Sequence, residues 1–455
     1  MVVAILVGLV ALTVIAALQW YVWRRVVRDT TLRGTVARRV GTTVFLVGPA
    51  LMVAGLTSGR AGAPFWLERV LAWPGYLWLA LMLYLVLALA VGEPVRPLLR
   101  RFLARRDQRK QNDQQAAPGP DADPGASDGA PAAPLSAALG PVPEAIAPEH
   151  PTPEVTTPEH PTPEHPTPEG PAPHGASAPL TPSRRLFLSR AVAGTAVAAA
   201  TATVGAGAYS VLNGPAVKRV TVPLAKLPRA AHGFRIAVVS DIHLGPILGR
   251  SFAQRLVRTI NSTQPDLIAI VGDMVDGDVA DLGPAAEPLA RLRAKHGTYF
   301  VTGNHEYFSG AQQWVDEVRD LGLHPMENSR VELPAFDLAG VNDPAGEAEG
   351  EGPDFVRALG DRDPRRASVL LAHQPIVIHD AVRHGVGLQL SGHTHGGQLW
   401  PVNYLAGLQN PTLAGLERYG DTQLYVTRGA GAWGPPVRVG AESDITVVEL
   451  ASLQA

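Results

Sequence analysis

The sequence predicts an α/β domain in its C-terminal half, preceded by an apolar helical region and a proline-rich linker. Three uncharged apolar runs lie within the first 92 residues. Residues 107–182 are dominated by Pro, Ala, Gly, Glu, Gln and Ser. From about residue 217, short β-rich runs alternate with helical stretches, which is the pattern of an α/β domain.

The N-terminal region, residues 1–106, is predicted to be a three-helix transmembrane anchor. Its apolar runs cover residues 2–23, 41–58 and 70–92, and a run of about 20 residues can cross a hydrocarbon core of about 30 Å. The first run ends in aromatic residues followed by two arginines, as membrane interfaces favour. A cleaved signal peptide is the alternative for the first run, but no positive segment precedes it.

The loop charges predict an orientation for these helices. Six arginines lie between the first two runs, and six arginines and a lysine follow the third, whereas the short loop between runs two and three holds only Arg60 and Arg69. Positive loops stay in the cytoplasm, so the N-terminus is expected outside and residue 110 inside. Since no ionisable residue lies within a run, the helices are interpreted as an anchor and not as a transporter.

Residues 107–182 are predicted to be a disordered linker, because they offer too little apolar surface to offset chain entropy. The next segment, 183–213, begins with Ser-Arg-Arg-Leu-Phe-Leu and resembles the twin-arginine export motif. The alternative is a positive flank of a fourth transmembrane helix over 191–212, and the two interpretations are compatible. Both place residues 214–455 outside the cytoplasmic membrane, so the predicted location is a multi-pass membrane protein with an extracytoplasmic domain.

The C-terminal block is predicted to contain buried strands that alternate with helices. The strands are expected from apolar runs bounded by turn residues, and they cover 234–240, 267–271, 298–302, 368–372 and 388–390. Helices are expected at 251–262, 284–295 and 312–321.

Hard metal-binding side chains lie at or just past the C-terminal end of each predicted strand, the edge at which ligands collect in α/β sheets. The chain has no cysteine, so no thiolate competes with them. The candidate metal ligands are Asp241, His243, Asp273, Asn304, His373, His393 and His395. They suffice for two divalent metals that share one carboxylate, an arrangement suited to in-line displacement at phosphorus.

The order of these motifs, D-x-H, G-D, G-N-H-E, H and G-H-x-H, resembles the calcineurin-like metallophosphoesterase family. Gly396-Gly397-Gln398 and Arg428-Gly429 resemble its membrane-associated bacterial branch, typified by the YkuE and YaeI phosphodiesterases. The resemblance covers about 215–450 and implies a two-sheet αββα sandwich. One departure is Ser443-Asp444, where the family has Pro-Glu.

The resemblance also implies a role for each motif residue. Asp241, His243 and His395 bind a first metal, Asp273 bridges both metals, Asn304, His373 and His393 complete the second, and the catalytic His305 faces the scissile phosphate. Two divalent ions are therefore expected, and the donor mixture suits Mn, Fe or Zn comparably. Asp276 and Glu306 are expected to accept hydrogen bonds from the ligating imidazoles.

The predicted activity is hydrolysis of a phosphodiester or pyrophosphate by a hydroxide that both metals share, with His305 as proton donor to the leaving oxygen. The apolar segment 399–406 either lines an entrance for a lipid-linked phosphoester or packs as core. The expected partners are the substrate, the membrane and the twin-arginine translocase. The formal charge is −2 and only 18% of residues are charged, so the sequence has no basic excess and nucleic acid is not expected as a partner. The alternatives are a non-catalytic membrane scaffold and a metal-dependent nuclease.

Overall fold

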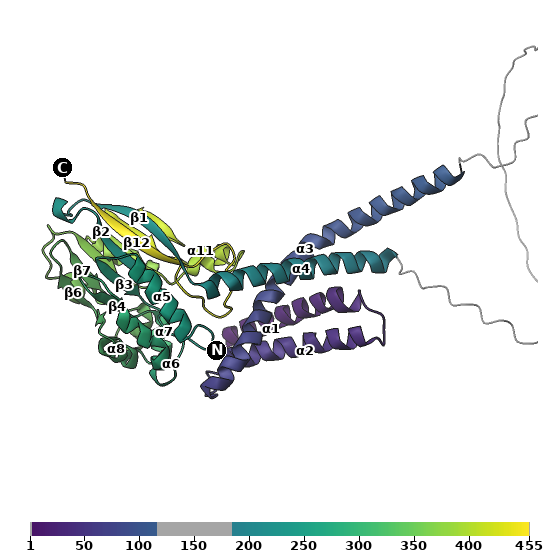
Figure 1. Cartoon of the computed structure of the whole chain (residues 1–455), viewed down its shortest axis with the longest axis horizontal. Coiled ribbons are helices and arrows are strands. Elements are labelled where there is room, and N and C mark those ends of the chain that lie inside the picture. Colours follow the sequence, from purple (N-terminus) through teal and green to yellow (C-terminus); the bar gives the residue numbers. More distant parts are fainter. Residues whose placement is uncertain (1, 116–183, 455) are drawn as a thin grey trace, which may run out of the picture. The chain divides into compact units, whose positions relative to one another are not determined.

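The computed structural model describes residues 2–115 and 184–454. Among these residues, 2–98 and 184–454 form one compact unit, and 99–115 are separate from it. Figure 1 shows the helices and strands of the chain. The expected linker lies outside the described residues from 116 onward.

Within residues 2–115 and 184–454, four helices are long and apolar enough to cross a membrane. They are α1 (Val2–Trp23), which continues through the π-helical turn η1 (Arg24–Arg28), α2 (Val36–Thr57), α3 (Phe65–Gln115) and α4 (Arg184–Asn213). The four expected apolar helices are thereby confirmed by length and composition. The twin-arginine pair forms the first residues of α4.

Three of these helices extend beyond their predicted ranges, and α4 does so by beginning at Arg184 and not at 191. α2 begins at Val36 because the Thr35 side chain accepts a hydrogen bond from the backbone N–H of Arg38 and caps the first turn. α3 continues to Gln115, so residues 107–115 of the predicted linker are helical. Residues 98–115 contain neither Gly nor Pro and are rich in Arg, Gln and Leu, which favour a helix in polar surroundings too.

The C-terminal domain contains two six-stranded sheets, which confirms the predicted two-sheet fold. The first has the order β1-β12-β2-β3-β4-β5 and the second β10-β11-β9-β8-β7-β6. The strands of the first sheet are β1 (Ala216–Leu224), β2 (Phe234–Val239), β3 (Leu267–Val271), β4 (Thr298–Val301), β5 (His324–Pro325) and β12 (Asp444–Ser452). Those of the second are β6 (Ser329–Glu332), β7 (Asp337–Gly340), β8 (Ser368–Leu371), β9 (Leu388–Ser391), β10 (Gly415–Tyr419) and β11 (Thr422–Val426).

Helices cover the outer face of each sheet. The α-helices of this domain are α5 (Arg250–Ser262), α6 (Val279–Ala286), α7 (Asn304–Ser309), α8 (Ala311–Asp320), α9 (Phe355–Leu359), α10 (Ile378–Arg383) and α11 (Asn403–Gln409). Of these, α5, α6 and α8 pack on the first sheet, and α9 and α10 pack on the second. Short 3-10 turns lie between them: η2 (Arg229–Ala231), η3 (Glu287–Arg291), η4 (Pro344–Glu349), η5 (Pro375–Val377) and η6 (His395–Gly397). The helix expected at 284–295 is wrong in position, because the Asp278 side chain caps α6 at its start and the chain passes into η3 at Glu287.

Side chains of one strand alternate between two cores, which explains why the strands read as uninterrupted apolar runs. In β3, Ile268 and Ile270 pack in the core under α5, α6 and α8. Leu267, Ala269 and Val271 face the core between the two sheets. A third core joins β8 and β11 to α9 and α10. The layers are therefore helices, sheet, sheet and helices.

Asp444, at the departure from the family pattern, has a structural role. Its Oδ2 lies 2.6 Å from Nζ of Lys218, and its Oδ1 accepts hydrogen bonds from the hydroxyls of Thr427 and Thr446. The buried carboxylate joins the beginning of β12 to β1, the strand that follows α4.

Candidate metal centre

The predicted ligands gather at one edge of the two sheets. β2, β3 and β4 are parallel neighbours in the first sheet, and β8 and β9 are parallel neighbours in the second. Each of the five strands ends within four residues of a predicted ligand. Parallel strands bring their C-terminal ends to the same edge, so ligands scattered along the sequence meet in space.

The backbone at this edge is strained. Only eight described residues other than glycine have a left-handed φ, and five of them are predicted ligands. These five are Asp241, His243, Asp273, His393 and His395. A left-handed φ at such a residue costs on the order of 1–3 kcal/mol and persists where the surroundings enforce it, as at functional sites.

One group of ligand atoms comprises Asp241, His243 and His395, which lie within 4.8 Å of one another. The Nε2 atoms of the two histidines are 3.0 Å apart, and Asp241 Oδ1 is 3.3 Å from Nε2 of His395. Asp241 is fixed in turn by the hydroxyl of Ser240, which donates to its Oδ2 at 2.6 Å. These are the three residues that the family resemblance assigns to a first metal.

A second group comprises Asp273, His373 and His393, again within 4.8 Å. Asp273 Oδ2 lies 3.1 Å from Nε2 of His373, and Nδ1 of His393 lies 3.0 Å from Oδ1 of Asn304. Asp273 also belongs to a group with His243 and His305, which connects it to the first set. The Asp273 carboxylate therefore belongs to two groups of candidate ligand atoms.

Asp276 supports this centre as predicted. Its Oδ1 lies 2.8 Å from Nδ1 of His243 and 2.7 Å from Nδ1 of His305. One carboxylate therefore orients both a predicted ligand and the predicted proton donor. The backbone N–H of His305 also donates to Asp273 Oδ1 at 2.9 Å, which fixes the start of α7 against the centre.

The expected role of Glu306 is wrong. Its buried carboxylate does not contact an imidazole in the described residues but accepts hydrogen bonds from the backbone N–H groups of Asp273, Met274 and Gly303. As the third residue of α7 it reaches back to the capping position of its own helix, and it also holds the β3 turn. Burial, with the negative charge of Asp273, raises the pKa of Glu306 to about 7.

The electrostatics of the centre fit a bound cation. Burial opposes the charged form of His243, but the Asp276 carboxylate outweighs it and raises the pKa of this imidazole to about 9. Burial likewise opposes ionisation of Asp273, yet the neighbouring imidazoles, His373 first, hold its pKa well below the usual range. Burial and the charge of His373 lower the pKa of His393 to about 4, which keeps it neutral and able to bind metal.

The types of donor atom in the centre also fit a bound cation. Nε2 of His373 is buried and has no hydrogen-bond partner within the described parts of the chain, although Asp273 Oδ2 lies 3.1 Å away. Carboxylate, amide and imidazole donors directed at one another satisfy each other poorly, whereas a divalent cation between them would satisfy all of them. The residues present therefore fit the expected metals.

Arg438 is a supporting residue that the sequence analysis missed. Its buried guanidinium donates to the backbone carbonyls of His395, Gly431 and Ala441, and one Nη lies 2.9 Å from Nδ1 of His395. Burial lowers its pKa to about 10. A single charged residue within the apolar stretch 429–441 was the only signal for it in the sequence.

Two exposed aromatic residues flank His305. The rings of Phe308 and Trp433 lie edge-on to its imidazole, with centroids 5.7 and 5.6 Å away. Gln398 holds the backbone of Trp433 from both sides, since it accepts from the N–H at 3.1 Å and donates to the carbonyl at 2.9 Å. The Gly-Gly-Gln motif thus fixes the loop that carries one wall of the site.

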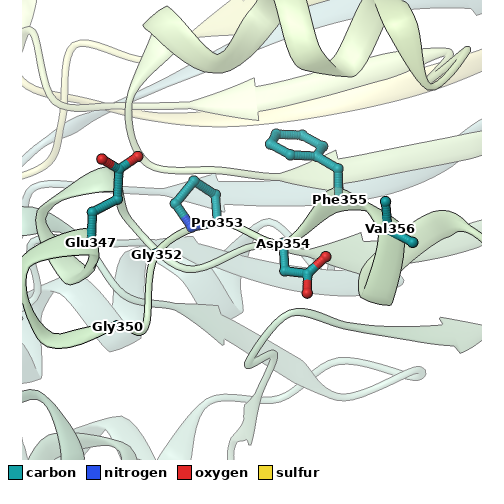
Figure 2. Close-up of a pocket in the computed structure, with 7 residues that line it drawn as sticks. All are labelled: Glu347, Gly350, Gly352, Pro353, Asp354, Phe355 and Val356. Carbon is teal, nitrogen blue, oxygen red and sulfur yellow. The ribbon is translucent and has the colours of Figure 1, made fainter.

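Other features lie apart from the centre. One hollow of about 500 Å³ has no predicted ligand in its lining. Figure 2 shows the residues that line it: Glu347, Gly350, Gly352, Pro353, Asp354, Phe355 and Val356. Histidines outside the motifs pack against aromatic rings, as His384 does against Phe355 and His324 against Tyr299.

Comparison with known proteins matches residues 234–397 to the family described as calcineurin-like phosphoesterase. The chain is 39% identical over 259 residues to a Danio rerio "Transmembrane protein with metallophosphoesterase domain", covering 53% of this chain and 59% of that protein. It is 34% identical over 251 residues to an "Uncharacterized metallophosphoesterase" of Aquifex aeolicus, covering 54% of this chain and 95% of that protein.

A third relative is the "Uncharacterized metallophosphoesterase YkuE" of Bacillus subtilis, which is 30% identical over 289 residues, with 59% of this chain and 98% of that protein covered. The chain spans less than two thirds of its vertebrate relatives, 59% of the Danio rerio and 64% of the Bos taurus protein. The similarity to the two bacterial proteins extends over nearly their whole length.

Proposed function

Since the chain belongs to the calcineurin-like metallophosphoesterase family, we propose that it is a metal-dependent phosphoesterase that hydrolyses a phosphodiester or a pyrophosphate. The observation that carries the proposal is the position of Asp273, whose carboxylate belongs to two groups of ligand atoms at once. A hydrolase of this kind needs two neighbouring cations to serve the attacking and the leaving oxygen.

In this proposal Asp241, His243 and His395 hold the first cation, and Asn304, His373 and His393 hold the second, with Asp273 between them. When bound, the two cations supply a nucleophile at neutral pH and offset the charge that develops at phosphorus. Mn, Fe and Zn suit these donors comparably. Asn304 contributes a neutral oxygen where a further carboxylate would over-neutralise the pair.

The role of His305 is to move a proton. Asp276 accepts from its Nδ1, which leaves Nε2 directed toward the centre, 4.0 Å from Asp273 Oδ2. A protonated Nε2 donates to the leaving oxygen, and the Asp276 carboxylate stabilises the imidazolium before transfer. The edge-on rings of Phe308 and Trp433 restrict the imidazole to this orientation.

We further propose that α1 to α4 anchor the chain in the cell membrane and that the domain from residue 214 onward lies outside the cytoplasm. The arginine-rich loops support this orientation. A twin-arginine route through Arg184 and Arg185 would export the folded domain with its metals already bound. Cysteine labelling tests this orientation, because the chain has no native cysteine. Val356→Cys should react with a membrane-impermeant maleimide on intact cells. If the cysteine reacts only after lysis, the domain lies in the cytoplasm and the proposed orientation is wrong.

The activity is tested with the full chain in lipid nanodiscs, stripped of metal and reloaded with Mn²⁺, Fe²⁺ or Zn²⁺. Bis(p-nitrophenyl) phosphate and p-nitrophenyl phosphate distinguish a diesterase from a monoesterase. Asp273→Ala should abolish turnover, and His305→Ala should lower kcat about 10²–10⁴-fold. His379→Ala, which changes an exposed histidine outside the centre, should leave it unchanged. Normal hydrolysis by both site variants would exclude this centre as the seat of activity.

A further inference from the structure

A charge-free, exposed apolar surface lies beside the metal centre. Residues 396–416 contain no Asp, Glu, Lys, Arg or His. Within them, α11 has no buried residue, and Tyr404, Leu405 and Leu408 are 67%, 64% and 83% exposed. Trp400 and Val402 extend the exposed apolar surface toward η6. We call these five side chains the α11 shelf.

Such a shelf is unusual on a water-soluble face. A short helix is normally retained by an apolar side that packs on the core, whereas α11 directs its large apolar side chains outward. Contiguous exposed apolar surface marks an interaction site. Tryptophan and tyrosine flanking leucines match the composition of membrane interfaces, where an apolar ring body and a polar tip are both accommodated.

The chain itself indicates what covers the shelf. α4 is apolar over Leu186–Asn213, and only Gly214 and Pro215 separate it from β1. If α4 crosses the membrane, the domain cannot move more than a few residues' length from the bilayer. The domain therefore remains at the lipid surface at all times.

Contacts with α4 lie next to the shelf. The backbone N–H of Arg438 donates to the carbonyl of Gly207 at 3.3 Å, and Val437 is fully buried in the cluster that includes Ala200 and Val204. Trp400 is joined to this segment, because its N–H donates to the carbonyl of Val439. Gly207 lies about 9 Å before the end of α4 along its axis, which is close to the thickness of the headgroup layer, about 5–8 Å on each side of the hydrocarbon core.

We propose that the α11 shelf inserts into the interface of the bilayer that α4 crosses, so that the metal centre works on phosphoesters carried by membrane amphiphiles. The inference rests on the membrane anchoring proposed above. Because η6 carries His395 and lies only five residues before α11, insertion of the shelf places the centre at the level of lipid phosphates. A second copy of the chain or another protein would have to enter the narrow space between domain and bilayer.

The test measures depth directly and does not require turnover. Single-cysteine variants Leu405→Cys and Leu408→Cys of the full chain are labelled with a nitroxide and placed in nanodiscs of phosphatidylcholine and phosphatidylglycerol. Power saturation then compares how accessible each nitroxide is to oxygen, which concentrates in lipid, and to a water-soluble nickel chelate. Val356→Cys is the control, since this side chain is 72% exposed on α9, which packs against β6 and β7 of the second sheet. The chain has no native cysteine to interfere.

We expect the nitroxides at 405 and 408 to favour oxygen over the nickel chelate, and the one at 356 to show the reverse. Equal, water-like accessibility at all three positions would overturn the proposal. Spin–spin broadening at 405 that disappears on dilution with unlabelled chain would also overturn it, by assigning the shelf to a second copy. Hydrolysis of bis(p-nitrophenyl) phosphate is measured separately. If the protein is active but the nitroxides at 405 and 408 are exposed to water, membrane insertion of the α11 shelf is refuted and the proposed activity is not. If the nitroxides lie in lipid but the protein is inactive, the proposed activity is refuted and insertion is not.

Discussion

Replacing Asp276 by Asn separates the two tasks that this carboxylate performs. Its Oδ1 lies 2.8 Å from Nδ1 of His243 and 2.7 Å from Nδ1 of His305, so an amide oxygen at the same place still accepts from both. The change removes the charge and preserves the shape. Burial opposes the charge of Asp276, but His243 outweighs burial and lowers the pKa to about 2, so the native carboxylate is ionised at neutral pH.

The expected loss follows from the two hydrogen bonds. A hydrogen bond to a charged group contributes about 1.5–3 kcal/mol and a neutral one about 0.5–1.5 kcal/mol. The difference is about 1 kcal/mol for each bond and about 2 kcal/mol for both. Since about 1.4 kcal/mol corresponds to a factor of ten, the combined loss is about 30-fold, within the range of about 10–100-fold for residues that orient metal ligands.

The assay divides this loss between its two sources. Metal affinity, measured by equilibrium dialysis of the full chain, reports on His243, and kcat at saturating metal reports on His305. Each should fall several-fold. Asp278→Asn makes the same chemical change two residues further on, where the side chain caps α6 and Asn caps equally well. Unchanged affinity and kcat in Asp276→Asn, or equal losses in both variants, would refute the reasoning.

Four further outcomes are expected. Gly392→Ala places a Cβ 1.7 Å from the hydroxyl of Ser240, so it should lower the free energy of unfolding by about 1–3 kcal/mol and the Tm by several degrees. Gly407→Ala is the control, because the space around Gly407 is open, and its Tm should not fall. Loading metal-free protein with Mn²⁺ should release protons, because His243 is protonated below its raised pKa of about 9. The Mn²⁺ affinity measured by calorimetry should therefore rise as the pH increases from 7 toward 9, and a pH-independent affinity would contradict this. Trp433→Ala should lower kcat more than it raises KM, because the Trp433 ring lies edge-on to the His305 imidazole and holds its orientation; a pure KM effect would assign the ring to substrate binding alone. Removal of metal with a chelator should lower the Tm, since about 2.7 kcal/mol of stability is lost when a ligand at a hundred times its Kd is withdrawn; an unchanged melting curve would argue against metal binding by the native fold.

The sequence identifies the strands that carry the centre and not the ones that complete the sheets. β2, β3, β4, β8 and β9 are buried on both faces and therefore appear as short apolar runs. β1 has an exposed first half, and β6 and β10 lie at sheet edges with largely polar or exposed side chains. Their strand conformation depends on pairing with distant partners, which no local pattern records.

The sequence likewise identifies some residues of the site and not others. All seven expected ligands and His305 come together, because each belongs to a short motif whose spacing is set by one strand end. The contacts of Glu306 and Arg438 could not be read from the sequence. Glu306 is predicted to accept a hydrogen bond from a ligating imidazole, but the first turn of α7 directs its carboxylate at backbone N–H groups. Arg438 reaches His395 across 43 residues of chain.

The arrangement of the ligands couples metal binding to the fold itself. In the first group, Asp241 and His243 follow a strand of the first sheet, while His395 follows a strand of the second. In the second group, Asp273 comes from the first sheet and His373 from the second. A cation held by either group would therefore join residues of both sheets at the edge where the ligands have a left-handed φ. Bound metal would offset this backbone strain and hold the sheets together, so we expect loss of metal to loosen this edge before the core between the sheets.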